Sequence, residues 1–151
     1  MRLTSDAFSD GCEIPRECGY KNGNRRPPLT ISGVPSEAKS LVIVMDDPDA
    51  MEAVGKVWVH WIIWNISPGC TGISADEPIL EGIQEGMTDF GEVGYGGPAP
   101  PDKRHTYVFK LYALDCKELT CADGKATKAD VEKVMEGHIL DQATLKGTYA
   151  P

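Results

Sequence analysis

The chain has 151 residues, a net charge of −8 and five cysteines. A chain of this length is expected to form one domain, residues 1–151, that buries roughly two-thirds of its unfolded surface without metal or disulfide staples. Its acidity argues against nucleic acid as a partner, because such binding begins with clustered Lys and Arg, and it argues against an anionic membrane surface. No run approaches ~20 apolar residues, so no transmembrane segment is expected.

The cysteines and the N-terminal residues give information about the cellular compartment of the protein. The number of cysteines is odd and no Cys-x-x-Cys pair occurs, which predicts reduced thiols rather than a zinc knuckle or a redox motif. A disulfide bond between Cys12 and Cys18, or between Cys116 and Cys121, is an alternative that the sequence leaves undecided. The first residues are polar and lack the apolar core of a signal peptide, although earlier removal of a signal peptide also stays open. These features favour a soluble, cytoplasmic protein.

The first third of the chain predicts loops, a short strand and one buried strand. Residues 1–28 are rich in Gly and Pro and should drape over a sheet as loops. Leu29 to Ile31 is short and β-prone, and Leu41 to Met45 is an apolar, mostly β-branched run of strand length. The like charges of Asp46 to Asp49, with a φ-locked proline among them, predict the end of that strand and a turn at the surface.

A second buried strand is predicted from Val57 to Trp64. Alternation divides it into two faces, one with Trp58, His60, Ile62 and Trp64, the other with Val57, Val59, Trp61 and Ile63. Both faces are apolar apart from His60, so the strand should lie inside a sheet that is covered on both sides. An inward histidine beside acidic groups at a strand end indicates the floor of a pocket.

The middle of the chain predicts a loop that leads into a strand. Gly72 to Gly86 should be a surface excursion with one short strand. Gly94 to Pro101 combines glycines, prolines and an aromatic residue, which is typical of a rigid binding loop, although a plain long connection stays open. The strand predicted from His105 to Leu114 begins directly after it. Its first two residues on one face, His105 and Tyr107, should therefore face the same pocket as the loop.

One helix is predicted near the C-terminus, from Thr127 to Leu145. Thr127 is its N-cap, with Asp130 completing a weaker form of the capping box. Helical spacing predicts a buried face of Val131, Val134, Met135, His138 and Leu145, and Gly147 suits the stop. His138 is expected to be a hydrogen-bonded core histidine rather than a ligand.

Two motifs resemble the signatures of a known family. They are Asp46-Asp47-Pro48-Asp49-Ala50 followed by Trp58-Val59-His60-Trp61, and Gly94-Tyr95-Gly96-Gly97-Pro98 followed by His105-Thr106-Tyr107. The chain is similar there to the phosphatidylethanolamine-binding protein family in its short bacterial and archaeal form, also described as Raf kinase inhibitor-like. The resemblance covers nearly the whole chain. It implies a mainly β fold, a Greek-key antiparallel β-sandwich with one C-terminal helix, and no cofactor.

The resemblance also implies a site and partners. The site is a small anion pocket for phosphate or a phospholipid headgroup, without catalytic or metal-binding residues, whose ligand-binding residues are Asp47, Asp49, His60, Gly97, Pro98, His105 and Tyr107. The protein would be a non-enzymatic binding or regulatory protein that modulates a kinase pathway or inhibits a serine protease. A homodimer stays open.

Two positions depart from the family pattern. Met51 stands where the family usually has a proline after Asp-Pro-Asp-Ala, often with a cis bond. A cis bond before a non-proline residue costs ~2.5–4 kcal/mol, so the bond between Ala50 and Met51 should be trans. Thr106 replaces the usual arginine between the histidine and the tyrosine, which changes the outer charge of the pocket.

The residue types fit an anion site with one conflict. Protonated His60 and His105, the Tyr107 hydroxyl and the amides near Gly97 can all donate to an oxyanion, whereas Asp47 would repel it. Three resolutions stay open: Asp47 pairs with a histidine, Asp47 shares a proton with the anion, or it holds the ammonium of a zwitterionic headgroup. The alternative function is a small hydrolase or metal-dependent enzyme that uses Asp47, His60 and His105.

Overall fold

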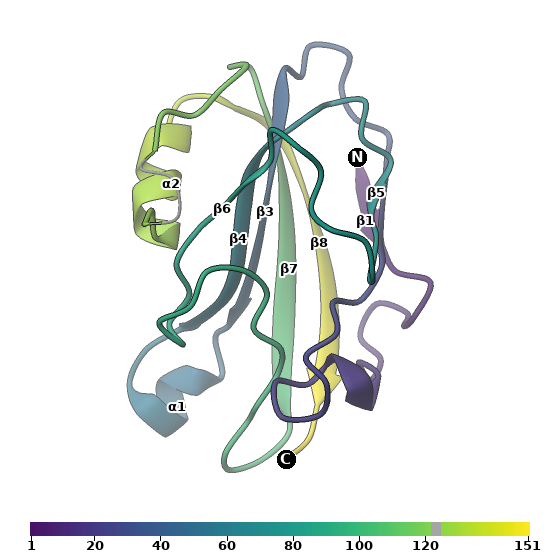
Figure 1. Cartoon of the computed structure of the whole chain (residues 1–151), viewed down its shortest axis with the longest axis vertical. Coiled ribbons are helices and arrows are strands. Elements are labelled where there is room, and N and C mark those ends of the chain that lie inside the picture. The colour runs from purple at the N-terminus through teal and green to yellow at the C-terminus, as the bar shows by residue number, and fades with distance from the viewer. Residues whose placement is uncertain (122–124) are drawn as a thin grey trace.

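The computed structural model, which describes residues 1–121 and 125–151, consists mainly of two antiparallel sheets (Figure 1). The smaller sheet has the order β1 (Arg2–Thr4), β2 (Leu29–Ser32) and β5 (Gly72–Ile73). The larger sheet has the order β6 (Gln84–Glu85), β4 (Trp58–Ile66), β3 (Ser40–Asp47), β7 (His105–Leu114) and β8 (Ile139–Tyr149). The helices are η1 (Arg16–Cys18, a 3-10 helix), α1 (Ala50–Val54) and α2 (Lys128–Met135).

One hydrophobic core lies between the two sheets. Leu3 and Ile31 of the smaller sheet belong to the same buried cluster as Ile43, Trp61 and Phe109 of the larger sheet. Burying these side chains stabilises the fold by roughly 1.5–3 kcal/mol for each large apolar residue. The mainly β, antiparallel sandwich predicted from the sequence is therefore confirmed.

The opposite face of the larger sheet is covered by α2. Val44, Ile62 and Trp64 of the central strands are buried against Val131 and Met135 of this helix, which lies beside β4 and β6 in Figure 1. Every residue of β3 is buried. The central strands are thus covered on both faces, as their apolar sequence predicts.

A β-bulge in β4 interrupts the alternation that the sequence predicts. The pairing of β3 with β4 passes from Met45 opposite Trp61 to Asp46 opposite Val59, so His60 is an extra residue without a partner in β3. An extra residue changes which face the following side chains occupy. The prediction that His60 shares a face with Ile62 is therefore wrong: Ile62 packs beneath α2, whereas His60 lines a pocket on the other side.

Only Pro48 and Asp49 of the acidic run form the predicted surface turn, whereas Asp46 and Asp47 are the buried end of β3. Asp46 and Asp47 are only 1% and 3% exposed, and successive strand residues point to opposite faces. Asp46 faces α2, where Lys128 Nζ donates to Asp46 Oδ2 at 2.7 Å and Lys110 Nζ at 3.3 Å. Asp47 points to the other face. The buried charge of Asp46 is thus compensated by lysines, and this pair ties α2 to the sheet.

The helix predicted from Thr127 to Leu145 is shorter, and the prediction is wrong beyond Met135. Its start is confirmed: Asp130 N–H donates to the Thr127 hydroxyl at 3.3 Å, and Thr127 N–H donates to the Asp130 carboxylate at 3.0 Å. Gly137, with φ +80°, then turns the chain, and β8 follows. His138 is exposed rather than in the core, with its side chain 47% exposed.

The strand β8 explains why helical spacing misleads in this segment. Leu145, Gly147 and Tyr149 are buried at every second position, and the whole strand pairs with β7. The helical interpretation groups Leu145 with Val131, but the period of this segment is two residues. Gly147 lies in the middle of the sheet rather than at a helix stop. A Cβ there would lie 2.5 Å from the Ile14 side chain, so the close packing of residues 8–14 requires glycine.

The segment after Asp47 forms α1, which the sequence did not predict. Met51 lies in this helix, and the described residues contain no cis peptide bond, so the expected trans bond before Met51 is confirmed. The excursion from Gly72 to Gly86 contains two short strands, β5 and β6, instead of one. None of the helices in the described part of the chain is long and apolar enough to cross a membrane.

All five cysteines carry free thiols. We therefore expect a reductant to change the melting temperature by no more than about a degree or two, since loss of a native disulfide costs ~2–5 kcal/mol, or many degrees. Calorimetric melting with and without a phosphine reductant measures the difference. A large fall would contradict both the free thiols and the expectation of a reducing compartment.

Candidate functional site

A pocket of about 190 Å³ brings together four of the residues selected from the sequence, Asp47, His60, His105 and Tyr107. They reach it from neighbouring strands. Asp47 ends β3, His60 is the bulge of β4, and His105 and Tyr107 begin β7, with β3 lying between the other two strands. The remaining walls are apolar and come from α1, the Trp58 and Phe90 rings, and the Ala99 to Pro101 loop.

His105 is held between two carboxylates. Its Nδ1 lies 2.7 Å from Asp47 Oδ2, and its Nε2 lies 2.7 Å from Asp102 Oδ1. A carboxylate only accepts hydrogen bonds, so both ring nitrogens act as donors and the ring is an imidazolium. Burial alone would lower the pKa of His105, but the hydrogen bonds and charges of Asp47 and Asp102 outweigh it and raise the pKa above its ordinary value.

His60 has the opposite electrostatic state. Its Nδ1–H donates to the Gly96 carbonyl at 2.7 Å, and the ring is only 2% exposed. Desolvation by burial lowers the pKa of His60 despite the Gly96 carbonyl and the Asp47 charge, which act to raise it. The ring is therefore neutral at pH 7, with its proton on Nδ1. The donor role that the sequence suggests for protonated His60 would therefore require the ring to take up a proton when the ligand binds.

The second nitrogen of His60 is Nε2, and the Gly97 backbone also lies near the ring, where it acts to raise the pKa. No partner for Nε2 meets hydrogen-bond geometry in the described part of the chain, and this atom is not among the side-chain atoms sealed from solvent without a partner. Because His60 lines the pocket, its Nε2 lone pair is available to a ligand.

Tyr107 places its hydroxyl near the Asp47 carboxylate and the Ala99 backbone, both of which act on its pKa. Its hydroxyl is one of two fully buried side-chain polar atoms without a hydrogen-bond partner among the described residues. The other, Trp64 Nε1, lies on the α2 face of the sheet, away from the pocket. Burial, together with the Asp47 charge, raises the pKa of Tyr107 well above its ordinary value, so the hydroxyl stays protonated. A buried unpartnered donor is costly unless a ligand satisfies it.

The other sequence-selected residues have structural contacts instead. The Asp49 carboxylate accepts from Thr106 N–H at 2.8 Å. Gly96 N–H donates to the His60 carbonyl at 2.9 Å, and Gly97 N–H donates to Asn24 Oδ1 at 2.7 Å. The expectation that these amides are free to cradle an anion is therefore wrong. Pro98 and the two glycines fix the loop, and Asp49 fixes the start of β7.

Glycine is required at position 97 for close packing. A Cβ built there would lie 1.9 Å from the Cys18 carbonyl oxygen, and Tyr20 N–H donates to the Pro98 carbonyl at 2.9 Å. The loop therefore packs directly on the backbone of residues 18–20. This packing positions the Ala99 to Pro101 wall of the pocket.

Sequence reasoning missed Phe90 and Asp102. Phe90 forms edge contacts with the His60 and Trp58 rings at 5.3 and 5.7 Å between centroids and stacks on Tyr20 at 4.1 Å. Nothing in the sequence around Phe90 indicates this position. Asp102 does have a signal, since it precedes His105, a residue selected from the sequence, by three residues.

The geometry does not favour the two enzymatic alternatives. Asp47 pairs with His105 rather than with His60, and no serine, threonine or cysteine that such a couple could activate lines the pocket in the described structure. A metal bound by both histidines and Asp47 would need a free nitrogen on each ring, but both nitrogens of His105 are engaged.

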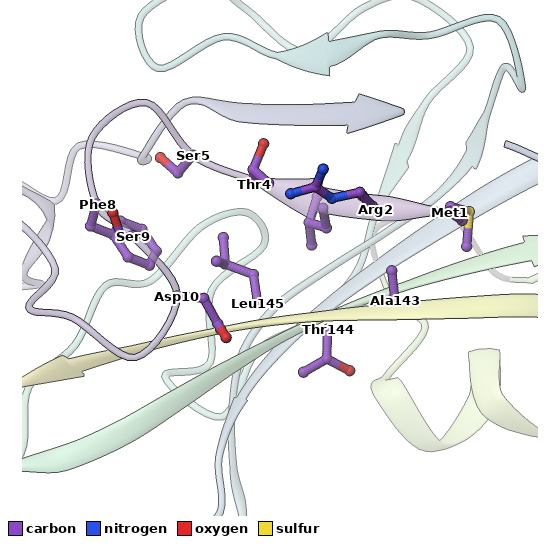
Figure 2. A pocket seen from close by; sticks show the side chains of 11 residues that line it. Met1, Arg2, Thr4, Ser5, Phe8, Ser9, Asp10, Ala143, Thr144 and Leu145 are labelled. Carbon is purple, nitrogen blue, oxygen red and sulfur yellow. The ribbon is translucent and has the colours of Figure 1, made fainter. Parts of the chain in front are cut away.

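A larger cavity, of about 490 Å³, lies apart from these residues. Figure 2 shows that β1 and the loop after it form one side and that Ala143, Thr144 and Leu145 of β8 form the other. None of the residues selected from the sequence as ligand-binding lines it. The smaller pocket is therefore the candidate site.

Comparison with known proteins confirms the resemblance. Residues 4–150 match the phosphatidylethanolamine-binding protein family, and the chain belongs to this family. A UPF0098 protein of Methanothermobacter thermautotrophicus is 44% identical over 153 residues, which cover 99% of this chain and 98% of that protein. A UPF0098 protein of Chlamydia trachomatis is 42% identical over 151 residues, with the same shares covered.

Two solved structures share the fold. A phosphatidylethanolamine-binding protein homologue from Chlamydia trachomatis has a TM-score of 0.89 at 39% identity, covering 98% of this chain and 95% of its own. E. coli YbcL, described as a new member of the mammalian family, has a TM-score of 0.90 at 30% identity, covering 98% and 96%. Membership of this family identifies the chain as a ligand-binding protein.

The pKa of His60 is lowered and that of His105 is raised. These opposite shifts predict that the free energy of unfolding is greatest near pH 6.5, the ordinary pKa of histidine. Below pH 6.5, His60 binds more protons in the unfolded state than in the folded state, so the free energy of unfolding rises with pH. Above it, His105 keeps its proton longer when folded, so this free energy falls with pH until the raised pKa is passed. Chemical denaturation at a series of pH values measures both slopes.

The variant Asp102→Asn tests the assignment of the second slope. It removes one of the two carboxylates that raise the pKa of His105, so the fall above pH 6.5 should become shallower. Asp115→Asn is the matched control, because Asp115 pairs with the exposed His138 at the same 2.7 Å. Both variants are measured with a chelator present, so that bound metal ions do not affect the comparison. An equal change of slope in both variants would contradict the assignment.

Proposed function

We propose that the chain is a non-enzymatic protein that binds a small phosphoryl-bearing ligand, either phosphate or a phospho-headgroup, in the pocket of His60 and Tyr107. The observation that carries the proposal is the Tyr107 hydroxyl, a buried donor without a partner in the wall of a pocket. A phosphoryl oxygen would accept from it and relieve the cost of the unpaired group.

The charges of the pocket select the protonation state of the ligand. His105 carries one positive charge, and Asp47 and Asp102 carry two negative charges, so this group is net negative. No lysine or arginine lines the pocket in the described part of the chain. A phosphoryl dianion would be repelled, whereas a group that keeps or gains one proton would fit.

His60 supplies the matching acceptor. Its Nε2 would either accept a hydrogen bond from a P–OH group or take up a proton and donate to the phosphoryl oxygen. In both cases the complex holds one proton more than the separated partners at high pH. Of the three resolutions open at the level of the sequence, pairing of Asp47 with a histidine is the arrangement found, with His105 as the partner.

Regulation of a kinase pathway, inhibition of a serine protease and a homodimer are implied by the resemblance, but none of the contacts of the described residues points to a protein partner. A protein that binds the phosphoryl group without a nucleophile or a second acid–base group in contact with it is expected to return the ligand unchanged.

Replacing Tyr107 by phenylalanine separates binding from stability. Loss of the hydroxyl should weaken phosphate binding by about 0.5–1.5 kcal/mol and should leave the free energy of unfolding unchanged or raise it by about 1 kcal/mol, since an unpaired buried group is removed. Tyr95→Phe is the control: its hydroxyl donates to the Cys18 carbonyl at 2.8 Å, so it should lose stability and keep binding. Titration calorimetry and chemical denaturation give the two numbers. A stability loss in Tyr107→Phe equal to that of the control would sink the proposal.

Affinity should fall as pH rises. One extra proton in the complex gives a loss of up to about tenfold per pH unit once two pKa values are passed: that of free His60, which lies below 6.5, and the second pKa of the phosphoryl group, about 6 for a phosphate monoester. His60→Asn keeps a donor where Nδ1 meets Gly96 but removes Nε2, so it should lower affinity by about 1.5–3 kcal/mol and flatten the pH dependence. His138→Asn, at the exposed histidine, should change neither.

Three probes distinguish the sources of the ligand chemistry. Inorganic phosphate, phosphoethanolamine and ethanolamine are titrated between about pH 5.5 and 8.5, the interval in which histidine and phosphate change charge. The proposal expects binding of both phosphoryl compounds and none of ethanolamine. Binding of ethanolamine at an affinity equal to that of phosphoethanolamine, or an affinity that climbs with pH, would contradict a phosphoryl site.

A further inference from the structure

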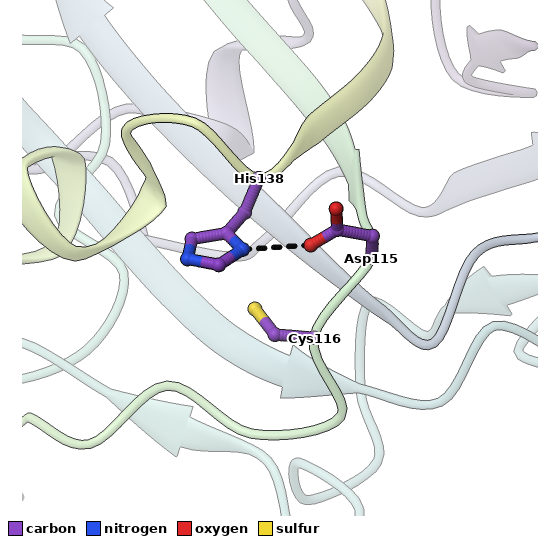
Figure 3. Close-up of side chains that lie close together, drawn as sticks. All are labelled: Asp115, Cys116 and His138. Carbon is purple, nitrogen blue, oxygen red and sulfur yellow. Dashed lines mark hydrogen bonds and ion pairs between the residues drawn. The ribbon is translucent and has the colours of Figure 1, made fainter.

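Three side chains of different metal-binding types meet at the far end of the larger sheet. Asp115 and Cys116 directly follow β7, and His138 directly precedes β8. One ligand atom from each lies within 4.8 Å of the other two. Figure 3 shows the His138 ring facing the Asp115 carboxylate, with the Cys116 thiol pointing toward the ring.

Hydrogen bonds to the backbone fix the positions of these three residues. Asp115 N–H donates to the His138 carbonyl at 3.0 Å, and the Ser40 hydroxyl donates to the Cys116 carbonyl at 2.6 Å. Leu114 and Ile139, the neighbours of the two segments, pair in the sheet. The cluster therefore joins positions 23 residues apart through the fold itself, at the end of β7 opposite the ligand pocket.

The side chains are already partly organised. His138 Nδ1 lies 2.7 Å from Asp115 Oδ1, and both side chains are 47% exposed. By itself this is an ordinary surface pair of little energetic value. The half-buried Cys116 beside it adds a thiol, and thiol, imidazole and carboxylate together are the ligand set of zinc rather than of calcium or magnesium, which prefer oxygen alone.

We propose that Cys116, His138 and Asp115 form a binding site for a divalent cation of the zinc class. Zinc bond lengths of 2.0 to 2.3 Å place ligand atoms of a tetrahedral site about 3 to 4 Å apart, so side-chain movements of about 1 Å close the site from 4.8 Å. The cation binds the thiolate, a ring nitrogen and a carboxylate oxygen, and the thiol proton leaves to solvent. Water takes the fourth position because the site is half exposed.

The bound cation would link the exit of β7 to the entry of β8. It would not contact the ligand pocket, since His105 begins β7 and Cys116 lies just past its end. Phosphate affinity should therefore be the same with and without zinc. The site is an addition to the proposed binding function and does not depend on it.

Titration of the full chain, first treated with a chelator and reductant, with Zn²⁺ tests the proposal. We expect one equivalent to bind, and Co²⁺ to give a sulfur-to-cobalt charge-transfer band in the near ultraviolet. Cys116→Ser should abolish this band, and both Cys116→Ser and His138→Ala should weaken Zn²⁺ binding by at least about tenfold. Cys12→Ser, which removes an exposed thiol elsewhere, should change neither. Unchanged affinity in both site variants, or no band with the parent chain, would overturn the proposal.

A second measurement needs no variant. Alkylation of the folded parent chain, followed by peptide mapping, gives the modification rate of each cysteine with and without Zn²⁺. Zinc should slow modification of Cys116 at least about tenfold and leave that of Cys12 unchanged, because a metal-bound thiolate no longer reacts freely. Equal protection of the two thiols, or protection of neither, would also overturn the proposal.

Discussion

The pocket depends on the imidazolium of His105 and its two carboxylates. This buried charge joins three segments: Asp47 at the end of β3, His105 at the start of β7, and Asp102 in the loop between the Ala99 to Pro101 wall and β7. Breaking a buried ion pair by removing one partner typically costs about 3–5 kcal/mol. The hydrogen bonds therefore hold the mouth of the site in one geometry, and they leave neither nitrogen of His105 for a ligand.

A division of roles between the two histidines follows. His105 is charged because carboxylates surround it, and it positions the site. His60 is neutral because burial lowers its pKa more than the Gly96 carbonyl raises it, and its Nδ1 is the nitrogen that meets this carbonyl. The β-bulge produces this arrangement, since without the extra residue His60 would follow the alternation of Ile62 toward α2. Bulges are known to redirect side chains next to functional sites.

Much of the fold could be predicted from local sequence, because β-branched apolar runs and a capping box are local signals. The strand from His105 to Leu114 and the helix start at Thr127 are found as predicted. The helix end was missed because Val131, Met135 and His138 continue a helical spacing past Gly137, although the next segment forms a strand whose partner, β7, is distant in sequence.

The site was predictable in part. The two motifs select Asp47, His60, His105 and Tyr107, which do share one pocket. The state of each histidine was not predictable, because burial and the neighbours that shift a pKa are properties of the folded chain. The roles expected for the Gly96 and Gly97 amides failed for the same reason: loop composition does not reveal that Asn24 and the His60 carbonyl already accept from them.

The central claim is that His105 is a fixed imidazolium whereas His60 is a neutral ring that meets the ligand. Nitrogen NMR of the histidine rings at pH 7 tests it most directly, before and after addition of inorganic phosphate. The account predicts protons on both nitrogens of His105, a proton on Nδ1 alone for His60, and a phosphate-induced change at His60 Nε2 with His105 unaltered. A neutral His105 in the free protein, or a phosphate response at His105 and not at His60, would contradict it.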